Sequence, residues 1–345
     1  MSVNVGVVGL GMGRAHCRWA TEHPDARLAA VADKDPERQK RAGEEFGVDK
    51  RYASAEEMLD AEDLDILAIA TPNAFHCPLA LQGFEHGCNV FCEKPMAMNA
   101  EEGKKMVEAG RAAGKRLMID FSFRFRDNSM AMKRVVEEGT LGDVYFARTQ
   151  WLRRRFLPGF GGWFGKKELS GGGPLIDLGV HRLDLALWLM GYPKPVHVLG
   201  AAYDPIASRL AAEEGKEYDV EDLAAAMIVF ENGASLQLVA SWASHIEHGD
   251  IMSLELMGTE AGLADHVATG EAPPIKIFSE EAGGLYDRCL NRVLEPTPTP
   301  LGHFVESIRD DKPHVATGEE GVVVMELLDA IYRSAETGAP VRVEE

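Results

Sequence analysis

Residues 3–16 read VNVGVVGLGMGRAH and decide the fold of the N-terminal half of the chain. An apolar strand runs directly into closely spaced glycines and a helical pattern follows, which is the context in which a glycine-rich turn binds a dinucleotide. We expect Gly9 to make the tight turn and Gly11 to let the backbone approach the pyrophosphate. The helix that follows would offer its N-terminal amides to that negative charge.

Met12 and Gly13 complete the expected cofactor turn, but the spacing of the glycines is unusual. In the G-x-G-x-x-G pattern, the third glycine allows the helix to pack closely against the strand. Gly13 comes one residue earlier than this third glycine. Either the loop is one residue short, or Ala15 provides the small residue at this contact. A plain strand-to-helix turn without a ligand is the alternative interpretation of the whole stretch.

Asp33 ends the second expected strand, 24 residues after Gly9. A carboxylate here accepts hydrogen bonds from the adenosine ribose and repels a 2′-phosphate, so the sequence favours NAD over NADP. Lys34 and Arg38 follow closely and could bind a phosphate, which keeps NADP as the less favoured cofactor. A helix-capping role is the structural alternative for Asp33.

Short apolar runs alternate with amphipathic stretches throughout the N-terminal third of the chain. Continuous apolar strands separated by helices are typical of a parallel sheet that is covered on both faces. We therefore predict an α/β domain with a doubly wound parallel sheet over residues 1–121. The expected strands cover residues 3–8, 28–32, 66–70, 89–92 and 116–119, and the expected helices cover residues 35–46, 75–86 and 100–113.

The pattern changes after residue 121, where segments of period-two alternation are joined by Asn-Gly and other glycine-containing turns. Such segments are typical of consecutive antiparallel strands. We predict an α+β domain over residues 122–345, built on an open, mainly antiparallel sheet. The expected helices cover residues 130–138, 175–190, 301–309 and 319–335, and the expected strands cover residues 144–151, 223–230, 234–242, 252–257 and 275–278.

Thr71, Pro72 and Asn73 follow the third expected strand, and His76 comes shortly after them. The carboxyl edge of a doubly wound sheet is where its ligands bind, so we expect these residues to line the nicotinamide ribose. A helix cap with His76 in the first turn explains the same residues without a ligand.

The sequence Cys92-Glu93-Lys94-Pro95 follows the fourth expected strand, which would place Lys94 beside a bound nicotinamide. Its ammonium group could hydrogen-bond the reacting oxygen and stabilise alkoxide character in the transition state. Glu93 could orient Lys94 through an ion pair. A surface Glu–Lys pair is the alternative interpretation.

Residues 170–184 read SGGGPLIDLGVHRLD and predict a helix that begins near Pro174. On a regular α-helix, Asp177, His181 and Asp184 share one face because successive members are four and three residues apart. A histidine beside a carboxylate can take a hydroxyl proton during oxidation and return it during reduction. A structural hydrogen-bonding role is the alternative for His181.

The order of these motifs, a glycine turn followed by Glu-Lys-Pro and Asp-x-x-x-His, resembles the Gfo/Idh/MocA family of sugar and polyol oxidoreductases over the whole chain. The resemblance implies an N-terminal Rossmann domain, a C-terminal domain with a large open antiparallel sheet, and homodimers or homotetramers formed through that sheet. It also implies that Lys94 polarises or positions the reacting hydroxyl, that His181 acts as acid and base, and that Asp177 helps to bind the substrate. Further matching segments are residues 123–125, 141–142, 231–233, 258–259 and 332–335.

A polyol needs several hydrogen-bonding groups and a flat apolar wall, for which Arg124, Arg154 and Trp163 are candidates besides the three catalytic residues. An arginine that faces the pocket would allow a carboxylated or phosphorylated sugar. Residues 157–173 contain seven glycines and would form either a mobile lid or a contact between subunits. His245 and His248 lie in a turn region, and we expect no metal site there.

The chain of 345 residues carries a formal charge of −19 and no long block of Lys or Arg. This charge excludes nucleic acid and anionic membranes as partners. The N-terminus lacks the features of a signal peptide, and the five scattered cysteines are expected to be reduced thiols. We therefore expect a cytoplasmic protein.

Together these observations predict an NAD-dependent oxidoreductase that transfers a hydride between nicotinamide and a hydroxyl or carbonyl carbon of a sugar, inositol or related polyol. One alternative is a redox-neutral sugar-converting enzyme that retains its NAD. The other is a non-catalytic protein that senses NAD(H), which is less favoured because a sensor has no need of an acid–base pair beside the nicotinamide.

Overall fold

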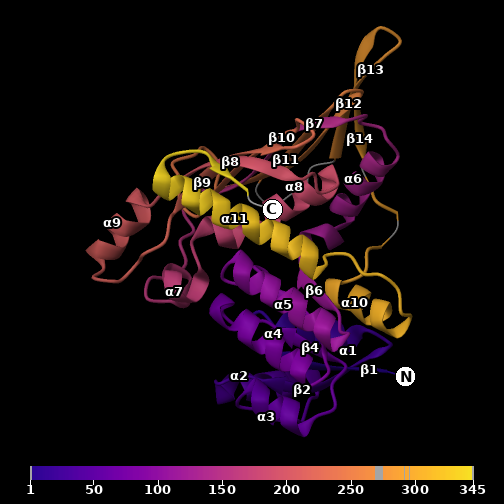
Figure 1. The fold of residues 1–345 in the computed structure, drawn as a ribbon, viewed down its shortest axis with the longest axis vertical. Helices are drawn as coiled ribbons and strands as arrows, with labels where there is room; N and C mark the ends of the chain where they lie inside the picture. Colours follow the sequence, from indigo (N-terminus) through magenta and orange to yellow (C-terminus); the bar gives the residue numbers. More distant parts are fainter. Residues whose placement is uncertain (1, 269–274, 291, 295, 344–345) are drawn as a thin grey trace. The chain divides into compact units, whose positions relative to one another are not determined.

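The computed structural model describes residues 2–268, 275–290, 292–294 and 296–343 (Figure 1). The chain forms two compact units, each with its own sheet. The first unit consists of Met1–Ser122 and Pro298–Met325, and the second consists of Phe123–Thr297 and Glu326–Glu345.

A C-terminal segment therefore belongs to the first unit, whereas the sequence analysis assigns all of residues 122–345 to one domain. The segment contains α10 (Pro300–Arg309) and the beginning of α11 (Gly318–Thr337). The physical reason is that α10 packs against α1 (Arg14–Glu22) and β6 (Leu117–Asp120) of the first unit.

The first unit is built on a sheet of six parallel strands, which are β1 (Val3–Val8), β2 (Ala26–Ala32), β3 (Arg51–Tyr52), β4 (Ile66–Ile69), β5 (Asn89–Glu93) and β6. Their order in the sheet is β3-β2-β1-β4-β5-β6. The order reverses between β1 and β4, and the carboxyl ends of strands at such a reversal form the ligand site of doubly wound sheets. The predicted doubly wound parallel sheet is confirmed.

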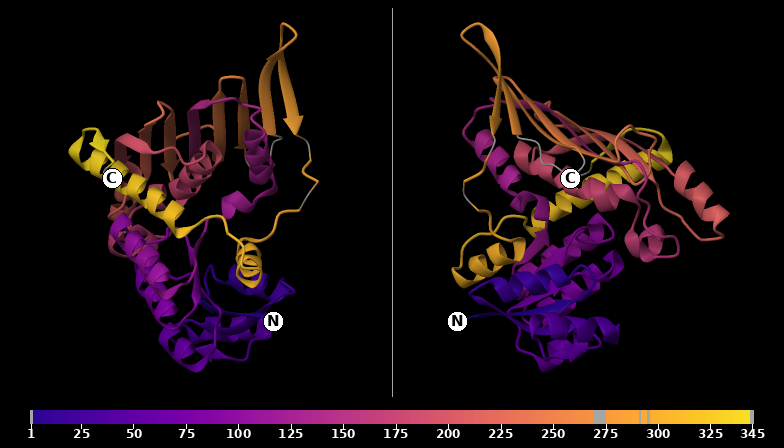
Figure 2. Two further views of the ribbon diagram at one scale, coloured as in Figure 1. Left: turned by 45° about the vertical axis from the view of Figure 1, so that its right-hand side comes forward. Right: turned by 180° about the vertical axis from the view of Figure 1, so that it is seen from behind.

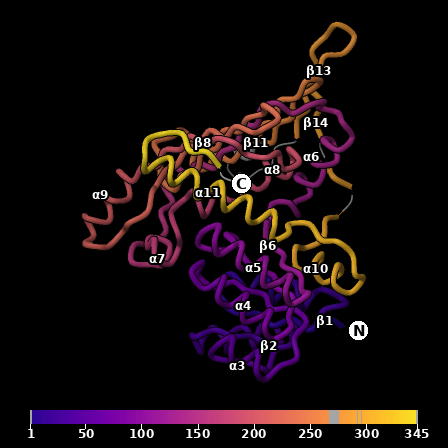
Figure 3. The backbone as a smooth tube through the Cα atoms, viewed as in Figure 1, coloured from indigo at the N-terminus to yellow at the C-terminus, as the bar shows by residue number. Residues whose placement is uncertain are grey.

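Helices of the first unit form two groups, as two covered faces require. α1 contacts α2 (Pro36–Phe46) and α10, whereas α4 (His76–Glu85) contacts α3 (Ala55–Ala61) and α5 (Ala100–Ala113), which runs beside it in Figure 3. α2, α3 and α5 begin at Asp35, Ser54 and Asn99, whose side chains accept hydrogen bonds from the first turn. Among the helices of the described residues, none combines the length and the apolar character needed to cross a bilayer.

The described residues of the second unit form nine strands, which are β7 (Val144–Arg153), β8 (Pro195–Tyr203), β9 (Leu223–Phe230), β10 (Ser235–Ser241), β11 (Asp250–Gly258), β12 (Ala261–Ala268), β13 (Ile275–Glu281), β14 (Gly284–Leu290) and β15 (Val341–Arg342). Their order is β14-β13-β12-β11-β7-β10-β9-β8-β15, and among these strands only β7 and β10 pair in parallel. The predicted open, mainly antiparallel sheet is confirmed. Sequence analysis missed β8, β12 and β14, which lack a long β-branched run.

One face of the nine-stranded sheet is covered by helices. α8 (Val180–Met190) packs against β7 and β10, and α6 (Asp127–Glu137) packs against α8. In both views of Figure 2, no helix of the described residues covers the opposite face. Leu199 and Val229 are 51% and 39% exposed on this helix-free face, because their neighbours Val198 and Ile228 point to the covered side.

The expected helix over residues 175–190 has an unexpected beginning. Leu175–Gly179 form a π-helical turn, and only from Val180 does the chain continue as α8. A π-turn has a wider spacing than an α-helix, so Asp177 and His181 do not lie in the simple i, i+4 relation that the sequence analysis assumes. Such turns are frequent at functional sites.

We predict that Gly13→Ala lowers the free energy of unfolding by about 1–3 kcal/mol. An added Cβ would lie 2.3 Å from the Gly9 carbonyl oxygen and 2.9 Å from Val7 Cγ1. Gly159→Ala is the control, since no atom of the described residues beyond its chain neighbours lies within 4 Å of the corresponding Cβ. Urea unfolding measures both variants, and equal midpoints would contradict this account of the packing.

Candidate active site

The glycine turn between β1 and α1 is shaped by close backbone contacts. Gly9 has a φ of +88°, and a Cβ there would lie 2.5 Å from the Ala70 carbonyl oxygen. Gly13 lies against Gly9 and Val7, so it supplies the small contact itself and the loop is one residue short. Gly11 and Met12 are exposed at the tip of the turn, with Met12 67% exposed. The exposed tip leaves backbone accessible to a ligand.

Asp33 is buried at the carboxyl end of β2 and contacts the glycine turn directly. Its Oδ2 accepts a hydrogen bond from the Leu10 N–H at 2.7 Å, and its Oδ1 accepts one from Asp35 at 2.9 Å. Arg38 Nη1 lies 3.7 Å from the same Oδ2. Each carboxylate oxygen keeps a second lone pair, so the group can still accept a ribose hydroxyl.

Thr71 follows β4 and offers a polar atom that the protein does not use. Its Oγ1 is buried and has no hydrogen-bond partner within the described residues. Pro72 precedes the short 3₁₀ turn Asn73–Phe75, in which Asn73 is buried. An unsatisfied buried hydroxyl is costly, which suits a position that a ligand completes.

His76 requires a correction, because its side chain is fully buried and engaged by the backbone. Nδ1 lies 2.8 Å from the Pro95 carbonyl oxygen and Nε2 lies 2.9 Å from that of Thr71. Burial lowers the pKa of His76, although both carbonyl contacts oppose this effect, so the ring is neutral and donates to one carbonyl at a time. His76 holds two loops together and does not offer a free group to the cofactor.

Lys94 directly follows β5, and the Lys94–Pro95 peptide bond is cis. Its neighbour Glu93 accepts a hydrogen bond from His16 of α1, with Oε1 3.2 Å from Nε2. The same nitrogen lies 3.2 Å from Oδ2 of Asp120, the last residue of β6. Glu93 is therefore tied to the interior of the unit and does not form a plain surface pair.

In the second unit, His181 is half-buried beside aromatic rings. Its ring centroid lies 4.6 Å from that of Phe123 and 6.0 Å from that of Trp151. Asp177, in the π-turn, accepts a hydrogen bond from Trp242 Nε1 at 3.0 Å. The unit thus presents a partly exposed imidazole and an oriented carboxylate next to a flat apolar wall.

Glu221 holds the beginning of this helix in place. Its carboxylate accepts hydrogen bonds from the backbone N–H groups of Gly173 at 2.8 Å and Leu175 at 2.9 Å, and from the Tyr332 hydroxyl at 3.0 Å. Burial raises the pKa of Glu221, while these hydrogen bonds oppose the rise. The carboxylate satisfies amides at the start of the π-turn that carries Asp177.

Arg124, which was expected to bind a substrate, is instead paired with Asp184. Both are buried, and Arg124 donates hydrogen bonds from Nε to Oδ2 at 3.0 Å and from Nη2 to Oδ1 at 2.6 Å of Asp184. The Tyr192 hydroxyl donates to the same Oδ1 at 2.8 Å. This bidentate pair joins the segment after β6 to α8, so neither residue is available to bind a substrate.

Arg154 and Trp163 lie near the surface of the second unit. Arg154 is exposed and donates to the Glu247 carbonyl oxygen at 3.2 Å, which leaves most of its donors for solvent. Trp163 stacks on Phe164 with ring centroids 3.9 Å apart, and Phe164 packs on Trp242. Trp163 therefore joins the aromatic cluster around Asp177, and Arg154 does not.

The expected catalytic residues are divided between the units, since Lys94 lies in the first and Asp177 and His181 lie in the second. Sequence analysis missed the residues that support them. His16 follows Gly13 by three residues within the motif itself, and its place beside Cys17 and Ala20 on the buried side of an otherwise polar helix is the signal that would have revealed it. The sequence contains no signal that would have revealed Glu221, which lies among other acidic residues. It contains none for Trp242 either.

We predict that Glu221→Gln lowers the free energy of unfolding by about 1–3 kcal/mol and lowers the activity, because one backbone N–H would then face an amide NH₂ group. Glu336→Gln is a matched control, since Glu336 is exposed and forms only a 3.7 Å ion pair with Lys167. Thermal unfolding and steady-state kinetics measure both effects. A native-like Glu221→Gln variant would show that this carboxylate does not hold the helix.

Comparisons with known proteins agree with the fold and the order of motifs. A family described as "Oxidoreductase family, NAD-binding Rossmann fold" matches residues 3–121, and its companion, "Oxidoreductase family, C-terminal alpha/beta domain", matches residues 133–343. D-glucoside 3-dehydrogenase of Escherichia coli (strain K12) is 31% identical, over 99% of this chain and 97% of its own length.

Two further relatives are similar over the whole chain. Inositol 2-dehydrogenase of Rhizobium meliloti (strain 1021) is 26% identical over 97% of both chains. A solved structure of levoglucosan dehydrogenase in complex with NADH and L-sorbose is 25% identical, with a TM-score of 0.86 and full coverage of both chains. Since the two family matches span most of the sequence, this protein belongs to the Gfo/Idh/MocA family of oxidoreductases.

Proposed function

We propose that the protein oxidises a secondary hydroxyl of a glucopyranoside and uses NAD as the hydride acceptor. The observation that carries the proposal is His181, whose imidazole is half-buried beside the rings of Phe123 and Trp151. An aromatic wall suits the apolar face of a pyranose, and neighbouring polar groups suit its hydroxyls. The E. coli relative named D-glucoside 3-dehydrogenase supports a glucoside as the substrate and C3 as the carbon.

The residues of the first unit fit a dinucleotide. Gly11 leaves room for the pyrophosphate, since only Arg38 Nη1, at 3.7 Å, comes within 4 Å of a Cβ placed there. Asp33 has lone pairs for the ribose, and Thr71 Oγ1 has no partner within the described residues. Relatives solved with NADH and with NAD support this cofactor. When bound, it supplies the hydride acceptor.

Three side chains would then act on the substrate. Lys94 hydrogen-bonds the reacting oxygen and stabilises its negative charge as the C–H bond breaks. His181 takes the hydroxyl proton, a contribution of roughly 100- to 10,000-fold for a well-placed general base. Asp177, oriented by Trp242, hydrogen-bonds an adjacent hydroxyl and fixes the sugar ring.

We further propose that copies of the chain associate through the helix-free face of the nine-stranded sheet. Exposed apolar residues on this face, Leu199 and Val229, support an interface there. The cytoplasm is the proposed location, supported by five free thiols, four of them buried.

The proposal predicts that NADH forms when the protein is mixed with NAD and a glucoside such as methyl glucoside. The absorbance of NADH measures this reaction. Lys94→Ala and His181→Ala should each lower kcat/KM by about 100-fold or more, because they remove an oxyanion stabiliser and a general base. Lys105→Ala and His86→Ala are the controls, since both residues are exposed.

Three outcomes would contradict the proposed function, each in a different way. Full activity in either catalytic variant would contradict the assigned roles. Conversion of the sugar without accumulation of NADH would indicate a redox-neutral enzyme that retains its cofactor. Tight binding of NAD without conversion of glucose, methyl glucoside, levoglucosan or myo-inositol would indicate a sensor.

We also predict that Asp33→Asn raises the KM for NAD by about tenfold or more, the cost of a hydrogen bond to a charged acceptor. The preference for NAD over NADP should fall as well, because the variant no longer repels a 2′-phosphate. Asp60→Asn, at an exposed position of the same unit, is the control. An unchanged preference would rule out a ribose-binding role for Asp33.

A further inference from the structure

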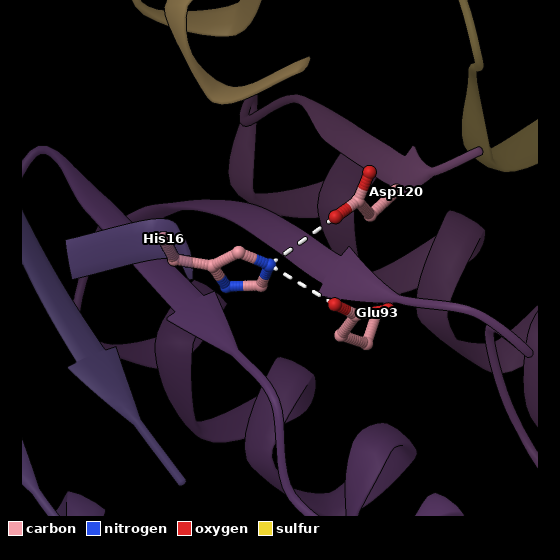
Figure 4. A group of neighbouring side chains, drawn as sticks. All are labelled: His16, Glu93 and Asp120. Carbon is pink, nitrogen blue, oxygen red and sulfur yellow. Dashed lines mark hydrogen bonds and ion pairs between the residues drawn. The ribbon is translucent and has the colours of Figure 1, made fainter. Parts of the chain in front are cut away.

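Three titratable side chains meet at the ends of β5 and β6, as Figure 4 shows. His16 comes from α1, while Glu93 and Asp120 are the last residues of β5 and β6 and are paired in the register of the sheet. Nε2 of His16 lies 3.2 Å from Oε1 of Glu93 and 3.2 Å from Oδ2 of Asp120. We name these three residues the His16 cluster.

The imidazole ring of His16 is fully buried, and its polar contacts are to the two carboxylates. It stacks on Trp19, with ring centroids 5.4 Å apart, and meets the edge of Phe91 at 5.0 Å. Within the described residues, its Nδ1 has no hydrogen-bond partner. Glu93 and Asp120 are therefore the groups that hold the polar edge of the ring.

The three side chains of the His16 cluster raise or lower one another's pKa values. Burial lowers the pKa of His16, but hydrogen bonds and charge from Asp120 and Glu93 outweigh it and raise the pKa to about 9. Burial and the charge of Glu93 raise the pKa of Asp120 to about 6. At neutral pH an imidazolium therefore lies between two carboxylates.

Other titratable groups reach the cluster from the elements packed around it. Lys94, after β5, interacts with both carboxylates, and His76 of α4 interacts with Glu93. His76 also lies 2.8 Å from the Pro95 carbonyl oxygen. The turn that carries Lys94 is thus held on one side through Glu93 and on the other through Pro95.

We propose that His16 and Asp120 are positioning residues for Lys94, which they hold in place through Glu93. A cluster of buried charges is a poor source of stability, since joint replacement of all its members by apolar side chains of the same volume often has no cost. Its value here is that Lys94 is the next residue after Glu93 in the chain. The inference rests on the proposed function, in which Lys94 stabilises the reacting oxygen.

The test compares Asp120→Asn, His16→Leu and His16→Gln by kinetics. Asp120→Asn and His16→Leu should lower kcat roughly tenfold or more, because a small displacement of a catalytic group is costly, with little change in the affinity for NAD. His16→Gln should recover part of the loss, since its amide can donate to both carboxylates. Asp60→Asn is the matched control, because Asp60 forms a 3.2 Å pair with His86 on the surface.

Two readouts are independent of turnover. Proton NMR of the His16 ring should show a pKa near 9 in the native protein, and a lower value in Asp120→Asn, which lacks one of the two charges that raise it. Acetylation of Lys94, measured by mass spectrometry relative to Lys105, should change in rate in Asp120→Asn and His16→Leu but not in Asp60→Asn.

These readouts separate the two proposals. If the native protein forms no NADH but the acetylation of Lys94 responds to the variants, the proposed function fails and the positioning role stands. If kcat and the acetylation rate are native in Asp120→Asn and His16→Leu, the positioning role is wrong. Equal losses of NAD affinity and thermal stability, without a separate effect on Lys94, would also overturn it by showing a purely structural role.

Discussion

The close approach of α1 to β1 is the constraint on which the first unit depends. Gly13 lets the start of α1 lie against β1, since an added Cβ there would lie 2.3 Å from the Gly9 carbonyl oxygen and 2.9 Å from Val7 Cγ1. Gly9 lets the turn pass the end of β4, since an added Cβ there would lie 2.5 Å from the Ala70 carbonyl oxygen. This approach leaves the tip of the turn open for a dinucleotide. It also brings His16, in the first turn of α1, to the ends of β5 and β6, where Lys94 begins the next segment.

Buried carboxylates have a similar task in both units. In the first, Glu93 and Asp120 share the imidazole of His16, and in the second, Glu221 accepts two backbone N–H groups and a tyrosine hydroxyl. Each carboxylate is placed next to a segment that carries an expected catalytic residue. Such groups stabilise a fold weakly, but they specify one arrangement of the backbone, which catalysis requires.

Much of the architecture could be predicted from the sequence. The apolar run of β1 followed by glycines predicted the parallel sheet, and alternating segments such as Leu223–Phe230 predicted the antiparallel one. Strands without that pattern, such as Pro195–Tyr203, were missed because their place depends on neighbouring strands. The π-turn at Leu175–Gly179 could not be predicted, since a helical pattern does not reveal a local change of hydrogen-bond spacing.

Individual side chains were harder to assign than elements, because their roles depend on partners distant in sequence. Arg124 was expected to face a substrate, but it is paired with Asp184, 60 residues away. The central claim, that hydride passes from a glucoside to the nicotinamide, is tested most directly with a glucoside deuterated at C3. The account predicts deuterated NADH by mass spectrometry, and NADH without deuterium, or unlabelled cofactor after conversion of the sugar, would contradict it.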